Sequence, residues 1–172
     1  VTADIKADAV VNGQEFVLNS CGNNTVTFKN ESELKAYIRS YHWTFDVNGN
    51  KVESTDRDAT FTFPGVGSYL GSMIVNEGEQ CGDTAYIKVN VFPTITADFE
   101  FDYDTCIGGP VSFKDKSYTL AQSLTDWNWD FGDTEKSIVR NPNHLYQTPG
   151  NHPVRLIVKD NNQCKDTMLQ TV

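Results

Sequence analysis

Apolar and polar residues alternate along much of this chain. A period of two is typical of β-strands that bury one face and expose the other to solvent. We therefore expect a protein built from short, half-buried strands. The clearest alternations set Trp127, Trp129 and Phe131 against Asp126, Asn128 and Asp130, and Tyr41, Trp43 and Phe45 against His42, Thr44 and Asp46.

Further apolar runs predict more strands, and residues that favour turns separate them. One window, 32–40, has a helix-like pattern, but it is short and can also be a loop with a single turn. Short strands, regular turns and a tryptophan in mid-domain indicate an antiparallel sandwich of immunoglobulin type. The additional strands are expected at 26–28, 60–63, 73–75, 86–91, 111–113, 154–158 and 168–172.

The chain repeats itself. Trp43-x-Phe45 returns as Trp129-x-Phe131, and the tetrapeptide that begins at Cys81 (CGDT) returns at Cys164 (CKDT). The offsets are 129 − 43 = 86 and 164 − 81 = 83, each close to half of the 172 residues. We predict two copies of one domain, 1–93 and 94–172. Because Pro93 fixes φ and removes an amide donor, the joint between them should be short and stiff.

The four cysteines follow the repeat, since each copy contains two of them. Pairing within each copy is the natural choice, so we predict the disulfides Cys21–Cys81 and Cys106–Cys164. A zinc site is the alternative, but the spacing lacks the close cysteine pair that such sites use. A bridge over a loop of about 60 residues would stabilise the fold by roughly 4 kcal/mol. Disulfides also indicate an oxidising, extracellular environment.

Composition narrows the classes of function. With 23 acidic and 14 basic residues the net charge is −9, which argues against a nucleic-acid partner. The charge divides evenly, 7 − 12 = −5 for 1–93 and 7 − 11 = −4 for 94–172. An aromatic content of 12% excludes a disordered acidic tail. No run approaches the roughly 20 apolar residues of a membrane span, so we expect a soluble part of a longer protein.

Three segments of the second copy resemble one known family. They are WDFGD at 129–133, NPNHLY at 141–146, and Gly150 followed by Val154, Leu156 and Val158. Together they look like the PKD (polycystic kidney disease) domain. The first copy is similar only through the repeat, and Phe61 and Phe63 stand where the second has His144 and Tyr146. The residues that carry this motif and core are Trp43, Phe45, Trp129, Asp130, Phe131, Gly132, Asp133, His144 and Tyr146.

The resemblance implies a non-catalytic extracellular module, a spacer or a site of protein and carbohydrate contact. The added cysteine pair looks like the PKD repeats of very large Bacteroidetes surface proteins, including gliding adhesins exported by type IX secretion. The resemblance implies that the partners of this segment are neighbouring repeats of the same long chain and a surface polysaccharide or protein. The alternative is an accessory module of a secreted hydrolase that binds polysaccharide or collagen-like protein.

Catalysis finds little support in the residues. A triad needs a nucleophile, a base and an orienting acid, and the candidate bases are His42, His144 and His152. His42 falls on the predicted solvent face. His144 aligns with Phe61 and His152 with Tyr69, so these two histidines are expected to be structural. The carboxylates of Asp130 and Asp133 could suggest a glycosidase, but Asp133 stands where a turn uses its carboxylate to accept backbone amides. We expect no enzyme.

No cofactor is expected, with calcium as the open possibility. The spacing of Asp126, Asn128 and Asp130 is similar to the start of an EF-hand loop, but the glycine and glutamate of that loop are missing. The family resemblance instead nominates Asp98, Asp126 and Asp160 as calcium ligands in the second copy. The loop tyrosines could stack on sugars or pack at a rim; they are Tyr37, Tyr103 and Tyr118.

Overall fold

We analysed a computed structural model of the protein. It describes residues 5–6, 10–12, 15–33, 35–104, 108–120 and 123–172. Contacts divide the chain into two compact units, Val1–Phe92 and Pro93–Val172. The division falls one residue from the boundary predicted at 93. Each unit is described by itself below.

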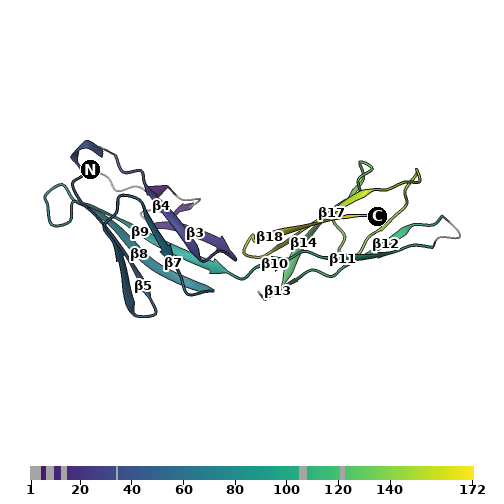
Figure 1. Ribbon diagram of the computed structural model, residues 1–172, viewed down its shortest axis with the longest axis horizontal. Coiled ribbons are helices and arrows are strands. Elements are labelled where there is room, and N and C mark those ends of the chain that lie inside the picture. Colours follow the sequence, from purple (N-terminus) through teal and green to yellow (C-terminus); the bar gives the residue numbers. More distant parts are fainter. Residues whose placement is uncertain (1–4, 7–9, 13–14, 34, 105–107, 121–122) are drawn as a thin grey trace. The chain divides into compact units, whose positions relative to one another are not determined.

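The first unit consists of a three-stranded and a six-stranded sheet (Figure 1). The small sheet has the order β1-β4-β7 and the large sheet the order β2-β3-β9-β8-β5-β6. A short 3-10 helix, η1 (Lys35–Tyr37), lies within the window 32–40 that has a helix-like pattern. The strands are β1 (Ile5–Lys6), β2 (Val10–Asn12), β3 (Glu15–Cys21), β4 (Thr25–Asn30), β5 (Tyr41–Val47), β6 (Asn50–Ser54), β7 (Ala59–Thr62), β8 (Gly67–Val75) and β9 (Asp83–Phe92).

Aromatic rings from both sheets form the core of the first unit. Phe28 on β4 packs against Phe45 on β5, with ring centroids 5.4 Å apart, and Phe61 on β7 lies 4.8 Å from Phe45. Trp43 is fully buried, and its indole nitrogen donates a hydrogen bond to the carbonyl of Asp56. The alternating residues of each strand thus meet between the sheets, as the period of two predicts.

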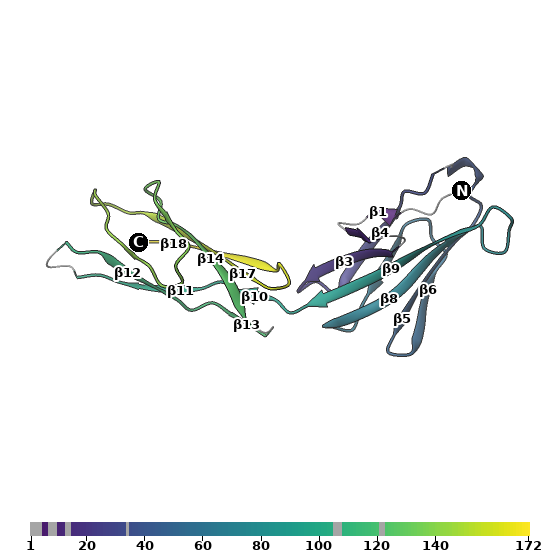
Figure 2. The ribbon, with the colours of Figure 1, turned by 180° about the vertical axis from the view of Figure 1, so that it is seen from behind.

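The second unit repeats the two-layer arrangement, with a four-stranded sheet in place of the six-stranded one (Figure 2). A sheet of order β11-β12-β16 faces one of order β15-β14-β17-β18, and β10 pairs with β13. Its strands are β10 (Ile95–Thr96), β11 (Phe99–Asp102), β12 (Val111–Asp115), β13 (Tyr118–Thr119), β14 (Leu124–Asp130), β15 (Lys136–Ser137), β16 (Asn143–His144), β17 (Pro153–Asp160) and β18 (Lys165–Thr171).

The core of this unit is again aromatic. Trp129 on β14 is fully buried and lies 5.5 Å from Phe113 on β12 and 5.1 Å from Phe99 on β11. Val154, Leu156 and Val158 of β17 complete the buried layer. The predicted all-β, immunoglobulin-like fold is confirmed. The described strand pairs are antiparallel except for one, because β3 runs parallel to β9.

The predicted disulfide Cys21–Cys81 is wrong. Cys21 ends β3 and pairs in register with Phe92, the last residue of β9, whereas Cys81 precedes the first residue of β9 by two positions. A ten-residue strand is about 30 Å long, while a disulfide needs Cα atoms within about 7 Å. Cys81 is a free, exposed thiol, and Cys21 and Cys164 are each disulfide-bonded. Cys106, in the second predicted bridge, lies outside the described residues.

No helix in the described part of the chain is long and apolar enough to cross a membrane.

Candidate functional site

The PKD-like motif of the second unit folds around one histidine. His144 Nε2 lies 2.6 Å from Asp133 Oδ2, and the His144 ring stacks on Phe131 with centroids 4.1 Å apart. Gly132 between them has φ +78°, and a Cβ there would lie 2.8 Å from the carbonyl oxygen of Pro153. Only glycine fits this turn without strain. The turn therefore holds Asp133 against the histidine.

Burial and hydrogen bonds shift two pKa values here. Partial burial of Asp133 opposes its ionisation, but the hydrogen bonds from His144 and from the backbone N–H of Glu135 prevail and lower its pKa. Burial, and the negative charge of Asp133, raise the pKa of Tyr146 to about 12. The Tyr146 hydroxyl donates to the carbonyl of Phe131. At neutral pH, Asp133 is thus ionised and Tyr146 keeps its proton, so both serve as fixed hydrogen-bond partners.

The contacts that the structure describes for the His144 side chain are with carboxylates and aromatic rings. His144 is 5% exposed, and its remaining nitrogen, Nδ1, lies 3.7 Å from a carboxylate oxygen of Glu135. No hydroxyl or thiol among the described residues is hydrogen-bonded to it, so the nucleophile of a triad is missing. His144 has the structural role that the sequence predicts.

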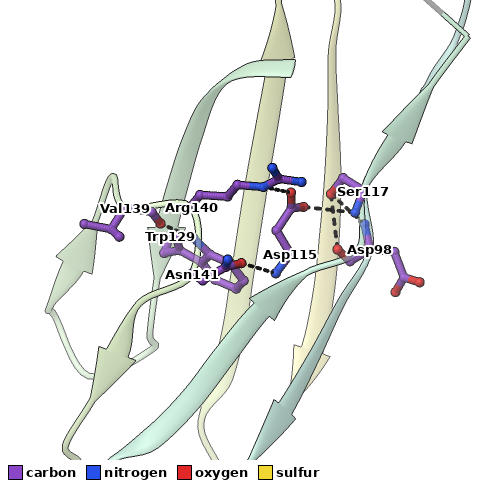
Figure 3. Close-up of polar contacts among 7 residues, drawn as sticks. All are labelled: Asp98, Asp115, Ser117, Trp129, Val139, Arg140 and Asn141. Carbon is purple, nitrogen blue, oxygen red and sulfur yellow. Dashed lines mark hydrogen bonds and ion pairs between the residues drawn. The ribbon is translucent and has the colours of Figure 1, made fainter. Parts of the chain in front are cut away.

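A second polar cluster surrounds the buried side chain of Asp115 (Figure 3). Its Oδ1 accepts the backbone N–H of Ser117 at 2.9 Å, and its Oδ2 accepts Nε of Arg140 at 3.0 Å. The Asp115 N–H donates to Oδ1 of Asn141 at 2.9 Å. These bonds tie the end of β12 to the segment before β16. We call Asp115, Ser117, Arg140 and Asn141 the polar bracket.

The first unit contains the matching bracket. The Asn30 N–H donates to Asp58 Oδ1 at 2.9 Å, and Asn30 Oδ1 accepts the N–H of Ser32 at 2.7 Å. Asn30 stands 85 positions before Asp115, and Asp58 stands 83 before Asn141. The two units therefore close with the same pattern of bonds, with the amide and the carboxylate exchanged. Nδ2 of Asn30 is buried and has no hydrogen-bond partner. In the second unit, by contrast, Oδ2 of Asp115 accepts a hydrogen bond from Nε of Arg140.

Sequence reasoning missed Arg140. Besides its bond to Asp115, its guanidinium carbon lies 5.3 Å from the centre of the Trp127 ring, a cation–π contact. A signal was present, because Arg57-Asp58 and Arg140-Asn141 recur at an offset of 83, the same offset as the cysteine tetrapeptides.

The nominated calcium ligands do not come together. Asp160 is buried, and its Oδ1 accepts the N–H groups of Asn162 and Cys164. Asp98 is exposed and accepts the N–H of Phe99, and Asp126 accepts the hydroxyl of Thr125. Across the described residues, no group of three His, Cys, Asp or Glu side chains is placed to hold a metal ion. The carboxylates nominated for calcium are instead used locally, mainly on backbone amides.

The stripe of Asp126, Asn128 and Asp130 faces a basic strand. Asp126 pairs in register with Lys159, and Asp130 pairs with Arg155, whose Nη2 lies 3.1 Å from Asp130 Oδ2. Asp130 and Asp133 thus belong to separate hydrogen-bond networks. The two acidic residues of the stripe therefore lie opposite basic residues of the neighbouring strand β17.

The other two histidines bind locally. His42 Nδ1 lies 2.6 Å from Glu77 Oε2, and Glu53 approaches Nε2 at 3.6 Å. The Glu77 hydrogen bond outweighs desolvation and raises the pKa of His42. His152 Nε2 hydrogen-bonds to the carbonyl of Thr148, and its ring stacks on Tyr146 at 3.9 Å. His42 Nε2 also lies 3.4 Å from the hydroxyl oxygen of Thr44.

The sequence places three tyrosines near predicted loops, where they could stack on sugars or pack at a rim. Tyr37 and Tyr118 are exposed, on η1 and β13. Tyr103 is half exposed, stacks on Phe101, and borders a hollow of about 460 Å³ at one end of the second unit. Tyr146, Pro149 and His152 also line this hollow.

Comparison with known proteins agrees with the motif. Residues 90–172 match the family model of the PKD domain, so the predicted resemblance of the second unit is confirmed. Among solved structures, the chain is similar to the PKD1 domain of Vibrio anguillarum Epp, with 29% identity, 45% of this chain and 89% of that chain covered, and a TM-score of 0.42. The chain is also similar to the PKD1 domain of the Vibrio cholerae metalloprotease PrtV, with 28% identity. That match covers 47% of this chain and 94% of that chain, with a TM-score of 0.42.

A third similarity concerns the fold of almost the whole chain. The fibronectin(III)-like modules of Clostridium thermocellum CbhA align over 98% of this chain and 92% of that chain, with 11% identity and a TM-score of 0.53. At this identity the match supports the all-β sandwich fold alone. A search of curated protein sequences found no match.

Proposed function

We propose that this chain is a non-catalytic extracellular segment, made of a PKD domain and a divergent copy of it, that serves as spacer and interaction module in a secreted or cell-surface protein. The observation that carries the proposal is the bracket shared by Asn30 and Asp115. Two units that close through the same pattern of bonds, at offsets of 85 and 83 residues, are best explained as copies of one domain. Repetition of a small rigid domain lengthens a chain without new chemistry.

The cysteines support an extracellular setting. Cys21 and Cys164 are disulfide-bonded, and such bonds persist in oxidising compartments. The acidic charge, −5 and −4 over 1–93 and 94–172, favours solubility and mutual repulsion in a repetitive array. These features fit the large gliding adhesins of the Bacteroidetes type, with neighbouring repeats as the main partners and surface polysaccharide or protein as further ones.

Single-molecule force spectroscopy on the 172-residue chain tests the spacer role, with reductant present so that no disulfide shields residues from the applied force. A spacer carries load through separate domains, so we expect separate unfolding events for the two units. A chain that unfolds in one event, or extends without resistance, would contradict the proposal.

A second candidate function is an accessory module that binds polysaccharide, and the hollow beside Tyr103 favours it. Aromatic faces of Tyr103, Tyr146 and His152 lie among polar groups of Asp104 and Asn151, a combination suited to a sugar ring and its hydroxyls. A glycan array tests it: binding that is lost in Tyr103→Ala and kept in Tyr37→Ala supports this function. Tyr37 is the control because it is exposed on η1 in the other unit.

A further inference from the structure

The outer face of the four-stranded sheet in the second unit carries positive charge in an acidic protein. Trp129, Leu156 and Val158 of this sheet are buried in the core, so the residues between them on the strands point outward. Of the outward charged residues on the four strands, four are basic and two are acidic. This face therefore carries 4 − 2 = +2, against −4 for residues 94–172. The six residues are Lys136, Arg155, Lys159, Lys165, Asp126 and Asp130.

Two of these basic residues stand directly opposite each other. Lys159 on β17 pairs in register with Lys165 on β18. Like charges in such a position destabilise a sheet, and neither lysine forms an ion pair among the residues that the structure describes. Asp126 lies on the other side of Lys159, and its Oδ2 accepts the hydroxyl of Thr125. The row of Asp126, Lys159 and Lys165 thus keeps a net charge of 2 − 1 = +1.

This row lines a groove of about 600 Å³, which we call the lysine groove. Its volume is typical of sites that bind small ligands. The next row across the same three strands, Asn128, Ile157 and Thr167, also lines it. So does Ile138, whose side chain is exposed. The groove therefore offers ammonium groups, hydrogen-bonding groups and an apolar surface beside one another.

These groups match a sugar that carries a carboxylate. One carboxylate can accept hydrogen bonds from both ammonium groups and neutralise the charge that the row keeps. Asp126, Asn128 and Thr167 can bond to the hydroxyls of a sugar, and Ile157 can pack against the apolar face of its ring. An acidic peptide would also meet the lysines, but its carboxylates bring no hydroxyl for Asp126 to accept.

We propose that the lysine groove binds a polysaccharide whose sugars carry carboxylates, that is, a polymer of uronic acids. The inference rests on the proposed function, because it names the chemical class of the surface polysaccharide that is a partner there. The lysine groove shares no lining residue with the hollow beside Tyr103, so the two sites can be tested separately.

Calorimetric titration of the 172-residue protein with polygalacturonate and with alginate tests the inference. Each sugar of these polymers carries one carboxylate. Lys159→Gln/Lys165→Gln removes both ammonium groups, so we expect binding to weaken at least about tenfold. The matched control is Lys114→Gln/Lys116→Gln, which removes the same charge beside β12, where both lysines pair with Glu100. We expect the control to keep its affinity, and melting temperatures show that both variants are folded.

Two further polymers separate recognition of the sugar from attraction by charge. Polygalacturonate with its carboxylates reduced to alcohols keeps the hydroxyls and loses the charge, and we expect it not to bind. Polyglutamate keeps the carboxylates and has no sugar hydroxyls, and we expect it to bind at least about tenfold more weakly than the acidic sugars. Polyglutamate that binds as tightly as they do would identify an acidic protein as the ligand and overturn the inference.

Three other outcomes would also overturn it. They are no binding of either uronic acid polymer, an equal loss of affinity in the two double variants, and a loss in Tyr103→Ala that Lys159→Gln/Lys165→Gln does not share. The proposed function has its own test. If the two units unfold separately under force, the spacer role survives the failure of this inference.

Discussion

The buried carboxylate of Asp115 accepts the Nε hydrogen of Arg140 at 3.0 Å, while Asn30, at the same place in the other unit, leaves its amide nitrogen without a partner. The Asp115–Arg140 bond joins two charged side chains, whereas the buried amide nitrogen of Asn30 has no such partner. Such bonds are stronger than neutral ones, and a buried donor without a partner costs free energy. The bracket is therefore tighter in the second unit.

Replacing Asp115 with asparagine tests the value of this bond. Asp115→Asn keeps one oxygen for Ser117 but removes the charge that Arg140 meets, and we expect the second unit to lose about 1 to 3 kcal/mol of unfolding free energy. Urea unfolding followed by tryptophan fluorescence measures it. Asp102→Asn is the control, because Asp102 is exposed at the end of β11. Equal effects of the two substitutions would show that the bond contributes nothing particular.

Gly132→Ala tests the turn that holds Asp133. Two costs add there, the left-handed φ of +78° and the close approach of a Cβ to Pro153, so we expect a loss of about 2 to 4 kcal/mol. In the same unit, Gly108 has φ +51° and open space around a Cβ. Gly108→Ala should therefore cost only about 1 to 2 kcal/mol. Thermal unfolding of both variants checks the difference, and equal shifts of the melting temperature would refute the clash with Pro153.

Acid should weaken the second unit through Asp133. The folded pKa of Asp133 lies below the ordinary value of an aspartate. The stabilisation is therefore present above that ordinary value and is lost as the pH falls through the folded pKa. We expect the unfolding free energy of the natural protein to fall more steeply below about pH 5 than that of Asp133→Asn. Denaturant unfolding at a series of pH values measures both slopes. Parallel slopes would mean that Asp133 titrates alike in the folded and unfolded chains.

The states of the cysteines can be read by mass spectrometry. Iodoacetamide added without denaturant should alkylate Cys81, because its thiol is free and exposed. Peptides that contain Cys21 or Cys164 should stay disulfide-linked until reductant is added. Cys81→Ser should leave the melting temperature unchanged, since no bond is lost. A peptide that joins Cys21 to Cys81 would contradict the register of β3 with β9.

Much of the fold could be read from local pattern. Alternation of apolar residues predicted the strands β5, β14 and β17. The motif residues predicted the resemblance to the PKD domain, and residues 90–172 match the model of that family. The strand β3 was missed, although Phe16 and Leu18 alternate there, because its pairing partner β9 is far away in the sequence. The window 32–40 gave only the short η1, which buries no residue.

The sequence by itself determined which positions of the two copies correspond, because a repeat preserves residue types at fixed offsets. It could not decide which of those positions meet. Cys21 and Cys81 fall in one copy, yet the parallel register of β3 with β9 puts them at opposite ends of a ten-residue strand. Likewise the acidic stripe that includes Asp130 faces Arg155 only because β14 lies beside β17. Such long-range pairings depend on strand register, which the tertiary structure sets by packing the two sheets together.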